Sequence, residues 1–296
     1  MGSPERVGFI GLGIMGTPMA RNLLAVGFPV TVHSRSPGPV ERLVAEGAAR
    51  ADSPASAAAA SEVTITMLPD TPDVEQVLVG RGGVIDGVAD GALVIDMSSI
   101  DPRPTREMAE TLGAKGVSML DAPVSGGERG AIDATLSIMV GGEEAAFARA
   151  APIFEALGKS IVLVGPSGAG QVCKACNQLV VAATIEAVAE ALLLAERSGV
   201  DAAKVRHALM DGFAGSKILE VHGQRMLDRA FDPGFRMRLH RKDARIVEEA
   251  AGVTATRIPS FEAVAAQMQR SIDAGDGDLD HSALYAQLAR ESTEGA

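Results

Sequence analysis

The sequence predicts an α/β domain with a largely parallel, doubly wound sheet, followed by an all-α domain that a long helix opens. Two observations support this. In the first half of the chain, short apolar runs alternate with amphipathic stretches, which is typical of βαβ units. After Gly165-Pro-Ser-Gly-Ala-Gly170, residues 171–197 contain no Gly or Pro, and every later segment has helical character. We therefore place the domain boundary near residue 165, with domains at 1–165 and 166–296.

The individual elements follow from local pattern and from the glycines and prolines that interrupt it. Short apolar or β-branched runs predict strands at 7–10, 29–33, 63–67, 93–95, 117–120, 136–140 and 161–164. Amphipathic or small-residue stretches between them predict helices at 14–26, 39–46, 55–60, 73–79, 103–112 and 143–157. The second domain is predicted to contain helices at 171–197, 202–211, 216–227, 241–251, 260–274 and 281–290.

Composition excludes several classes of protein. Lys and Arg total 27 and Asp and Glu total 38, so the formal net charge is −11. Such a chain repels nucleic acid and anionic membranes. Two cysteines cannot build a disulfide scaffold. The glycine-broken N-terminus is a poor signal peptide, and no run of about 18 apolar residues predicts a membrane span. We expect a cytoplasmic protein.

The most specific motif is Gly11-Leu12-Gly13-Ile14-Met15-Gly16, which follows a predicted strand and opens a helix. Gly11 permits the tight turn, Gly13 lets a pyrophosphate approach the backbone, and Gly16 allows close packing of helix and strand. The helix N-terminus adds unpaired N–H groups. The motif predicts a dinucleotide site in a Rossmann-type domain; the alternative is an ordinary tight βα turn.

Residues after the next strands indicate which dinucleotide binds. The second strand ends in His33-Ser34-Arg35-Ser36, without the acid that selects NAD. Because Arg35 could fork onto a 2′-phosphate, NADP(H) is favoured, although NAD(H) stays open. Strand-end residues Met67, Leu68, Pro69 and Ser99 are further candidate cofactor contacts. Ser98 and Ser99 could instead cap the helix that follows.

A second glycine-rich turn, Asp121-Ala-Pro-Val-Ser-Gly-Gly127, has features suited to a carboxylate. Ser125, Gly126 and Gly127 offer a hydroxyl and closely spaced backbone N–H groups, although a plain surface turn has the same composition.

The long helix carries Lys174 and Asn177 on one face, with no acid within one turn of the lysine. A partly desolvated lysine can exchange a proton, whereas a solvated helix lysine is the simpler interpretation. Cys173 and Cys176 form a C-x-x-C pair, but zinc would need more ligands and a redox pair would sit at a strand-to-helix turn. We predict no metal site. Asp280-His281-Ser282 lacks the nucleophile elbow of a hydrolase and is better explained as a helix cap.

Taken together, Gly8–Gly16, Asp121–Gly127, Lys174-x-x-Asn177 and Lys242-Asp243 resemble the β-hydroxyacid dehydrogenase family over nearly the whole chain. Asp96–Ser99, Ser125–Glu128, Thr135–Gly142 and Asp280–Ala283 resemble its tartronate semialdehyde reductase branch most closely. The resemblance implies a Rossmann-type domain, a helical domain, and a substrate cleft between them. Two departures are Gln178, where many relatives have a second Asn, and Ser34, where some have Asn.

The resemblance also implies roles. Lys174 would be the catalytic acid/base and Asn177 would orient the substrate. Ser125, Gly126 and Gly127 would hold the substrate carboxylate, and Lys242 would close over the cofactor or substrate. The expected reaction is NAD(P)-dependent reduction of a short β-aldehyde acid, with tartronate semialdehyde giving glycerate. Alternatives are 3-hydroxyisobutyrate dehydrogenase, succinic semialdehyde reductase, imine reductase and a non-catalytic dinucleotide-binding protein.

The predicted long helix is apolar around much of its circumference and should be buried. We therefore expect a homodimer or homotetramer with this helix at its centre. The apolar residues are Leu179, Val180, Val181, Ile185, Val188, Leu192, Leu193 and Leu194.

Overall fold

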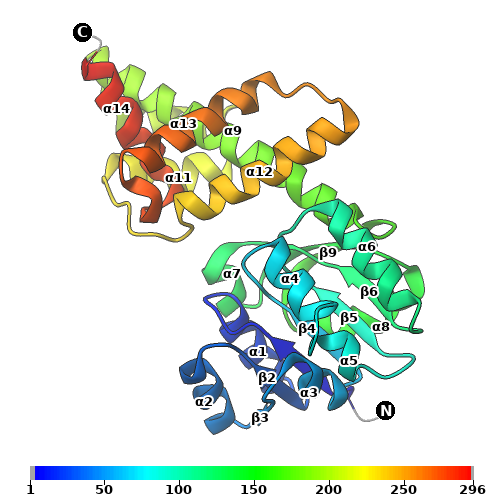
Figure 1. The fold of residues 1–296 in the computed structure, drawn as a ribbon. Coiled ribbons are helices and arrows are strands. Elements are labelled where there is room, and N and C mark those ends of the chain that lie inside the picture. The colour runs from blue at the N-terminus through cyan, green and yellow to red at the C-terminus, as the bar shows by residue number, and fades with distance from the viewer. Residues whose placement is uncertain (1–3, 295–296) are drawn as a thin grey trace. The chain divides into compact units, whose positions relative to one another are not determined.

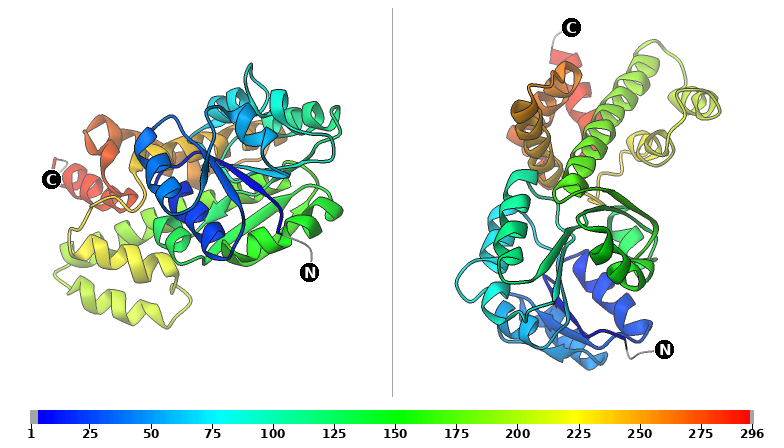
Figure 2. Two further views of the ribbon diagram at one scale, coloured as in Figure 1. Left: turned by 90° about the horizontal axis from the view of Figure 1, so that it is seen from below. Right: turned by 90° about the vertical axis from the view of Figure 1, so that its right-hand side faces the viewer.

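The computed structural model describes residues 4–294. The chain forms two compact units, one ending at Lys174 and the other beginning at Ala175. Helix α9 (Ala169–Arg197) is continuous across this division and contributes residues to both units (Figure 2). Because the division lies inside one helix, the boundary placed near residue 165 stays a prediction.

The N-terminal unit is built on one sheet. Within the described residues the sheet has nine strands in the order β3-β2-β1-β4-β5-β6-β8-β7, with β9 paired to β8. The pairs from β3 through to β6 are parallel, as is β8 with β9, and only β6–β8 and β7–β8 are antiparallel. The strands are β1 (Val7–Ile10), β2 (Val30–His33), β3 (Ala49–Arg50), β4 (Val63–Thr66), β5 (Leu93–Asp96), β6 (Ser118–Asp121), β7 (Val124–Ser125), β8 (Leu136–Gly141) and β9 (Gly158–Gly165).

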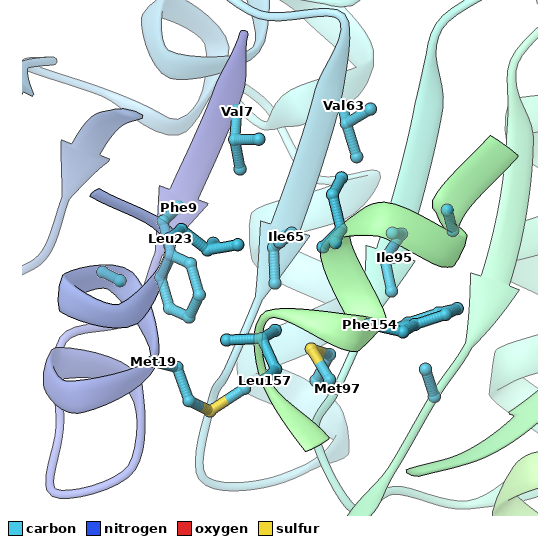
Figure 3. Packing of buried hydrophobic residues seen from close by; sticks show 14 of the residues in the cluster. Val7, Phe9, Met19, Leu23, Val63, Ile65, Ile95, Met97, Phe154 and Leu157 are labelled. Carbon is cyan, nitrogen blue, oxygen red and sulfur yellow. The ribbon is translucent and has the colours of Figure 1, made fainter. Parts of the chain in front are cut away.

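Helices cover both faces of this sheet, which explains why its central strands are apolar throughout. On one face, α1 and α8 pack against side chains of β1, β4 and β5 such as Phe9, Ile65 and Ile95 (Figures 1 and 3). On the other face, α3, α4 and α6 pack against Ile10 and Val94. The helices are α1 (Gly16–Ala25), α2 (Pro37–Ala45), α3 (Pro54–Ala59), α4 (Thr71–Leu78), α5 (Val84–Gly87), α6 (Pro102–Gly113), α7 (Gly127–Ile132) and α8 (Glu144–Glu155).

The C-terminal unit is helical in all its regular elements between residues 175 and 294. Its core is formed by α9, α11, α12, α13 and α14, with buried side chains such as Leu192, Phe261 and Tyr285. Helices α10 and α11 lie side by side, as do α12 and α13 (Figure 2). Beyond α9 the elements are α10 (Ala202–Met210), α11 (Lys217–Leu227), α12 (Met237–Thr254), α13 (Pro259–Asp273), the 3₁₀ turns η1 (Asp276–Asp278) and η2 (His281–Ala283), and α14 (Leu284–Glu294).

Each predicted strand and helix has a counterpart in the structure, so the predicted fold class is confirmed. The elements that the sequence did not predict are β3, β7, α5, α7 and η1. They span two to six residues each. Such segments are too short to show a hydrophobic period of 2 or 3.6 residues.

Within a single chain, helix α9 is only partly buried. Ile185 and Leu192 are fully buried, but Val180 and Leu194 are 60% and 68% exposed. An 18-residue window of this helix has a mean hydropathy of 1.8, which is enough in length and composition to cross a membrane, yet half of that window is buried in the structure. A core helix passes the same test. Self-association stays a prediction.

At the C-terminal ends of three helices, a residue other than glycine adopts the left-handed conformation that glycine usually takes there. The residues that follow the C-caps of α7 and α11 are Ala134 and Arg229, with φ of 52° and 53°. The C-cap of α12 is Ala255, also with φ of 52°. These left-handed backbone conformations place the Cβ close to the following carbonyl oxygen, which glycine avoids.

Candidate active site

The first glycine-rich loop lies between β1 and α1 and has the geometry that the motif predicts. Gly11 has φ of +101°, and a Cβ at this position would lie 2.3 Å from the carbonyl oxygen of Met67. A Cβ at Gly16 would lie 1.9 Å from the carbonyl oxygen of Gly11. By contrast, nothing lies within 4 Å of a Cβ built at Gly13. The loop is therefore closed where it packs on the protein and open at Gly13, which suits the close approach of a pyrophosphate.

The strand ends bring several predicted cofactor contacts to one edge of the sheet. The Gly11 N–H donates to the carbonyl of His33, which joins the loop to the end of β2. The Met67 N–H donates to the carbonyl of Ile10, and the Leu68 N–H donates to the Ser98 hydroxyl. Ligands of open α/β sheets bind beyond this carboxyl edge. In the sequence, Ser34, Pro69 and Ser99 directly follow His33, Leu68 and Ser98, respectively.

Ser98 does not cap the next helix, and neither does Ser99. The N-cap of α6 is Asp101, whose carboxylate accepts from the Arg103 N–H. The Ser98 hydroxyl instead donates to Asp96 Oδ1 at 2.6 Å while it accepts from Leu68. The capping alternative was therefore wrong, and Ser98 joins the ends of β4 and β5.

Asp96 is a fully buried carboxylate at the end of β5. Its Oδ1 accepts from the hydroxyls of Thr66 and Ser98 and from the Ser98 N–H. Burial raises the pKa of Asp96 to about 6, against the effect of these donors. Because all its partners are neutral, hydrogen bonding offsets only part of the cost of burying the charge.

Arg35 lies in the loop after β2, as the cofactor prediction requires. Its side chain is 82% exposed and forms an ion pair with Asp73 of α4, with 3.4 Å between Nη2 and Oδ1. An exposed pair of this kind is weak. A phosphate could therefore replace Asp73 as the ion-pair partner of Arg35 at a small cost in free energy.

The second glycine-rich turn joins β7 to the short helix α7. Ser125 ends β7 and is half-buried, and Gly126 and Gly127 have φ of +134° and +61°. Nothing lies within 4 Å of a Cβ built at Gly127. The turn thus presents open backbone at Gly127, and residues with side chains would strain both glycine positions.

Asp121, at the start of the same motif, anchors the first turn of α9. Its Oδ1 accepts from the Gly168 N–H at 2.7 Å, and its Oδ2 accepts from the Gln171 N–H at 2.9 Å. Burial raises the pKa of Asp121 to about 6, although these backbone donors lower it. A Cβ at Gly170 would lie 2.6 Å from the Asp121 carbonyl oxygen, so the helix begins in close contact with the end of β6.

Gln171 makes a second polar link from this turn of α9. Its side-chain amide donates to the Ser98 carbonyl at 2.8 Å and accepts from the Ile100 N–H at 3.1 Å. These bonds hold the loop that carries Ser99. Sequence reasoning assigned no role to Gln171 or to the Asp121 side chain. The only sequence signal was their place next to the two motifs.

Lys174 follows Gln171 by three residues and is 9% exposed. Since α-helices rise 1.5 Å per residue, its Cα lies about 6 Å along the axis from Gly170. The structure therefore brings the start of α9, Asp121 and the Ser98–Ile100 loop together within the N-terminal unit. Lys174 is the last residue of that unit.

The remaining predicted residues belong to the C-terminal unit. The Asn177 amide donates to the Gln178 carbonyl oxygen at 2.7 Å, and the Gln178 amide donates to Asp243 at 2.5 Å. Lys242 is paired with Asp243 at 2.8 Å. Gln178, where many relatives have Asn, thus links α9 to the Lys242–Asp243 pair. Cys173 and Cys176 are not joined by a disulfide in the described structure.

Comparisons with known proteins agree with this geometry. A family profile described as the NAD binding domain of 6-phosphogluconate dehydrogenase matches residues 6–165. A second, described as NAD-binding of NADP-dependent 3-hydroxyisobutyrate dehydrogenase, matches residues 168–288. A nicotinamide dinucleotide is therefore the cofactor of this chain, and the open backbone at Gly13 fits it.

Individual relatives cover most of the chain. It is 48% identical over 284 residues to 2-hydroxy-3-oxopropionate reductase of Escherichia coli (strain K12), covering 96% of this chain and 97% of that protein. It is 40% identical over 244 residues to 3-hydroxyisobutyrate dehydrogenase of Pseudomonas aeruginosa, covering 80% and 82%. A solved structure of Mycobacterium tuberculosis 3-hydroxyisobutyrate dehydrogenase with L-serine matches with a TM-score of 0.88 at 33% identity, covering 96% of this chain and 99% of that one. The chain belongs to the β-hydroxyacid dehydrogenase family and is an NAD(P)-dependent oxidoreductase of hydroxy acids.

Proposed function

We propose that this enzyme reversibly reduces tartronate semialdehyde (2-hydroxy-3-oxopropanoate) to glycerate, with NADP(H) as the preferred cofactor. The observation that carries the proposal is the 48% identity to a 2-hydroxy-3-oxopropionate reductase over nearly the full length of both chains. The matching chemistry is a buried lysine, Lys174, one turn into a helix that polar side chains fix to the dinucleotide-binding unit.

In this proposal Lys174 is the acid/base of the reaction. The reduced nicotinamide supplies the hydride that the aldehyde carbon accepts. As an ammonium group, Lys174 stabilises the negative charge that develops on the aldehyde oxygen and donates the proton that completes the alcohol. In the reverse direction, the neutral amine takes the proton from the hydroxyl. Removal of most water from around Lys174 strengthens its interaction with that oxygen.

The other predicted residues position the reactants. Ser125, Gly126 and Gly127 would hold the substrate carboxylate through the hydroxyl and the open backbone of the turn. Asn177, one helical turn from Lys174, would orient the substrate. Gly11–Gly16, Ser34, Met67–Pro69 and Ser99 would line the cofactor, and Lys242 would close over cofactor or substrate. Because the carbonyl carbon is held near the hydride donor in a fixed orientation, the bimolecular reaction becomes effectively unimolecular.

The role of Lys174 is tested by Lys174→Ala. Loss of the proton donor should lower kcat roughly 10²–10⁴-fold while the far-UV circular dichroism spectrum stays unchanged. Lys204→Ala, an exposed lysine on α10, is the matched control and should keep wild-type kcat. A folded Lys174→Ala enzyme with near-normal kcat would refute the assignment.

Substrate choice needs its own measurement. NADPH and NADH should be tested with tartronate semialdehyde, succinic semialdehyde and a cyclic imine, and NADP⁺ and NAD⁺ with 3-hydroxyisobutyrate and D-glycerate. We expect the highest kcat/KM with tartronate semialdehyde. A higher value with 3-hydroxyisobutyrate would favour the function of the 40%-identical relative. Cofactor binding without turnover of any compound would indicate a non-catalytic protein.

The cofactor preference depends on Arg35. We expect a kcat/KM ratio for NADPH over NADH above one, and a fall in that ratio for Arg35→Ala, because the guanidinium pairs with the 2′-phosphate. A wild-type ratio below one rejects the NADP(H) preference without affecting the proposed substrate.

A further inference from the structure

Three of the chain's five histidines meet in the C-terminal unit, and none of them is assigned above to the reaction. His222 comes from α11, His240 from the first turn of α12, and His281 from the turn η2. The rings of His222 and His281 lie edge to face, with 4.6 Å between centroids, and those of His240 and His281 are 4.8 Å apart. No motif of closely spaced residues in the sequence predicts this cluster.

The ring nitrogens of His222 and His281 face each other. The two Nε2 atoms are 3.3 Å apart. Zinc binds imidazole nitrogen at about 2.0–2.1 Å, so an ion at about 2.05 Å from both atoms would subtend about 107°, close to the tetrahedral angle. With Asp280, these residues form a group whose potential ligand atoms all lie within 4.8 Å of one another.

The opposite nitrogen of each ring lies near a polar side chain, beyond hydrogen-bond distance for His222 and within it for His281. His222 Nδ1 lies 3.6 Å from Asp280 Oδ1, and His281 Nδ1 lies 2.9 Å from His240 Nδ1. Metal-binding histidines in proteins almost always have their second nitrogen held by a carboxylate or another acceptor. The Asp280 carboxylate is itself fixed by the N–H groups of Gly234, Phe235 and Ser282 and by the Ser282 hydroxyl.

An ion pair and a partly exposed ring complete the surroundings of the cluster. Arg225 Nε lies 3.6 Å from Asp280 Oδ1 and offsets that carboxylate. His222, whose side chain is 18% exposed, gives the cluster a route to solvent.

We propose that His222 and His281 bind one borderline divalent transition-metal ion, such as Zn²⁺, through their facing Nε2 atoms, with Asp280 and His240 orienting the two rings. Solvent completes the coordination shell. The ion joins α11 to the turn η2 and so stabilises the C-terminal unit without taking part in hydride transfer. Thiolate-free sites of imidazole and water suit zinc, copper or nickel better than magnesium or calcium.

The test uses the full-length protein, stripped with EDTA and dialysed, and ZnCl₂ as the probe. Calorimetric titration should give one Zn²⁺ per chain, and His222→Ala should weaken this binding about tenfold or more. Zn²⁺ should also raise the Tm of wild type but not of His222→Ala, because an ion that binds only the folded state stabilises it. Since His222 is near the surface, this variant is expected to fold.

Two control variants separate this site from other zinc ligands of the chain. His207→Ala removes a histidine of α10 that belongs to no such cluster, and Cys176→Ser removes an exposed thiol of the C-x-x-C pair. Both should keep wild-type zinc affinity and the rise in Tm. The proposal is overturned if wild type shows no saturable binding, if His222→Ala binds as tightly as wild type, or if Cys176→Ser is the variant that loses the ion.

Discussion

The two units place their buried aspartates in contrasting surroundings. In the N-terminal unit, Asp96 and Asp121 accept hydrogen bonds from hydroxyl and backbone N–H groups, and burial raises both pKa values to about 6. In the C-terminal unit, the pKa of Asp280 lies below the ordinary value although burial opposes this, because His222, His281 and the donors of Ser282 and Phe235 favour the charged carboxylate. The polar groups around a buried carboxyl, rather than burial alone, decide in which direction its pKa shifts.

The largest effect is expected for Asp280→Ala. This change leaves the N–H groups of Gly234 and Phe235 and the Ser282 donors without their acceptor, and it removes the ion-pair partner of Arg225. Breaking a buried ion pair by removing one partner costs about 3–5 kcal/mol, which urea denaturation would measure. Asp278→Ala removes an exposed partner of Arg236 and Arg238 and should cost less than about 1 kcal/mol. Equal urea midpoints for the two variants would contradict the expected difference between the buried and the exposed aspartate.

Asp121→Ala should have a smaller effect on stability but a clear effect on catalysis. The N–H groups of Gly168 and Gln171 lose their acceptor, which costs about 2–3 kcal/mol for neutral donors. Because the first turn of α9 is no longer fixed, Lys174 is less well positioned, and kcat should fall more than KM rises. Asp201→Ala, which removes the N-cap of α10, should cost about 1 kcal/mol and leave kcat unchanged. Matching kcat values would show that Asp121 has no positioning role.

The smallest effect concerns pH and Asp96→Asn. The folded-state pKa of about 6 lies above the unfolded value of 3.8, so folding prefers the protonated form. This contribution to stability is fully present below pH 3.8 and is lost as pH rises through 6. Asparagine stays neutral and keeps an Oδ1 for Thr66 and Ser98. Between pH 4.5 and 8, the variant should therefore lose about 1–2 kcal/mol less stability than wild type. Parallel pH profiles in urea denaturation would contradict the raised pKa.

Most of the N-terminal unit could be predicted because its chemistry is local in sequence. Gly11, Gly13 and Gly16 lie within six residues, and the structure shows close packing at Gly11 and Gly16 and open space at Gly13. The strands of the sheet are short apolar runs with clear ends. The long helix could be predicted because no Gly or Pro interrupts it.

What the sequence could not predict depends on contacts between distant residues. Asp121 contacts Gly168 across 47 positions, and His281 contacts His240 across 41. Periodicity and local motifs carry no information at that separation, so the carboxylate that fixes α9 and the histidine cluster both went unnoticed. The sequence also could not show which apolar residues of α9, such as Val180 and Leu194, are exposed within a single chain, because an apolar helix pattern does not say which parts of the circumference are covered.

The left-handed cap at Ala255 bears on how the protein could be made more tolerant of heat. It ends the 18-residue helix α12, is exposed, and has no steric need for a methyl group in its unusual conformation. Glycine at this position would remove about 1 kcal/mol of steric strain from the folded backbone. Part of this gain would be lost, because glycine also increases the conformational entropy of the unfolded chain. An engineer seeking a more durable biocatalyst could therefore begin at this position, far along the chain from the lysine on which turnover is proposed to depend.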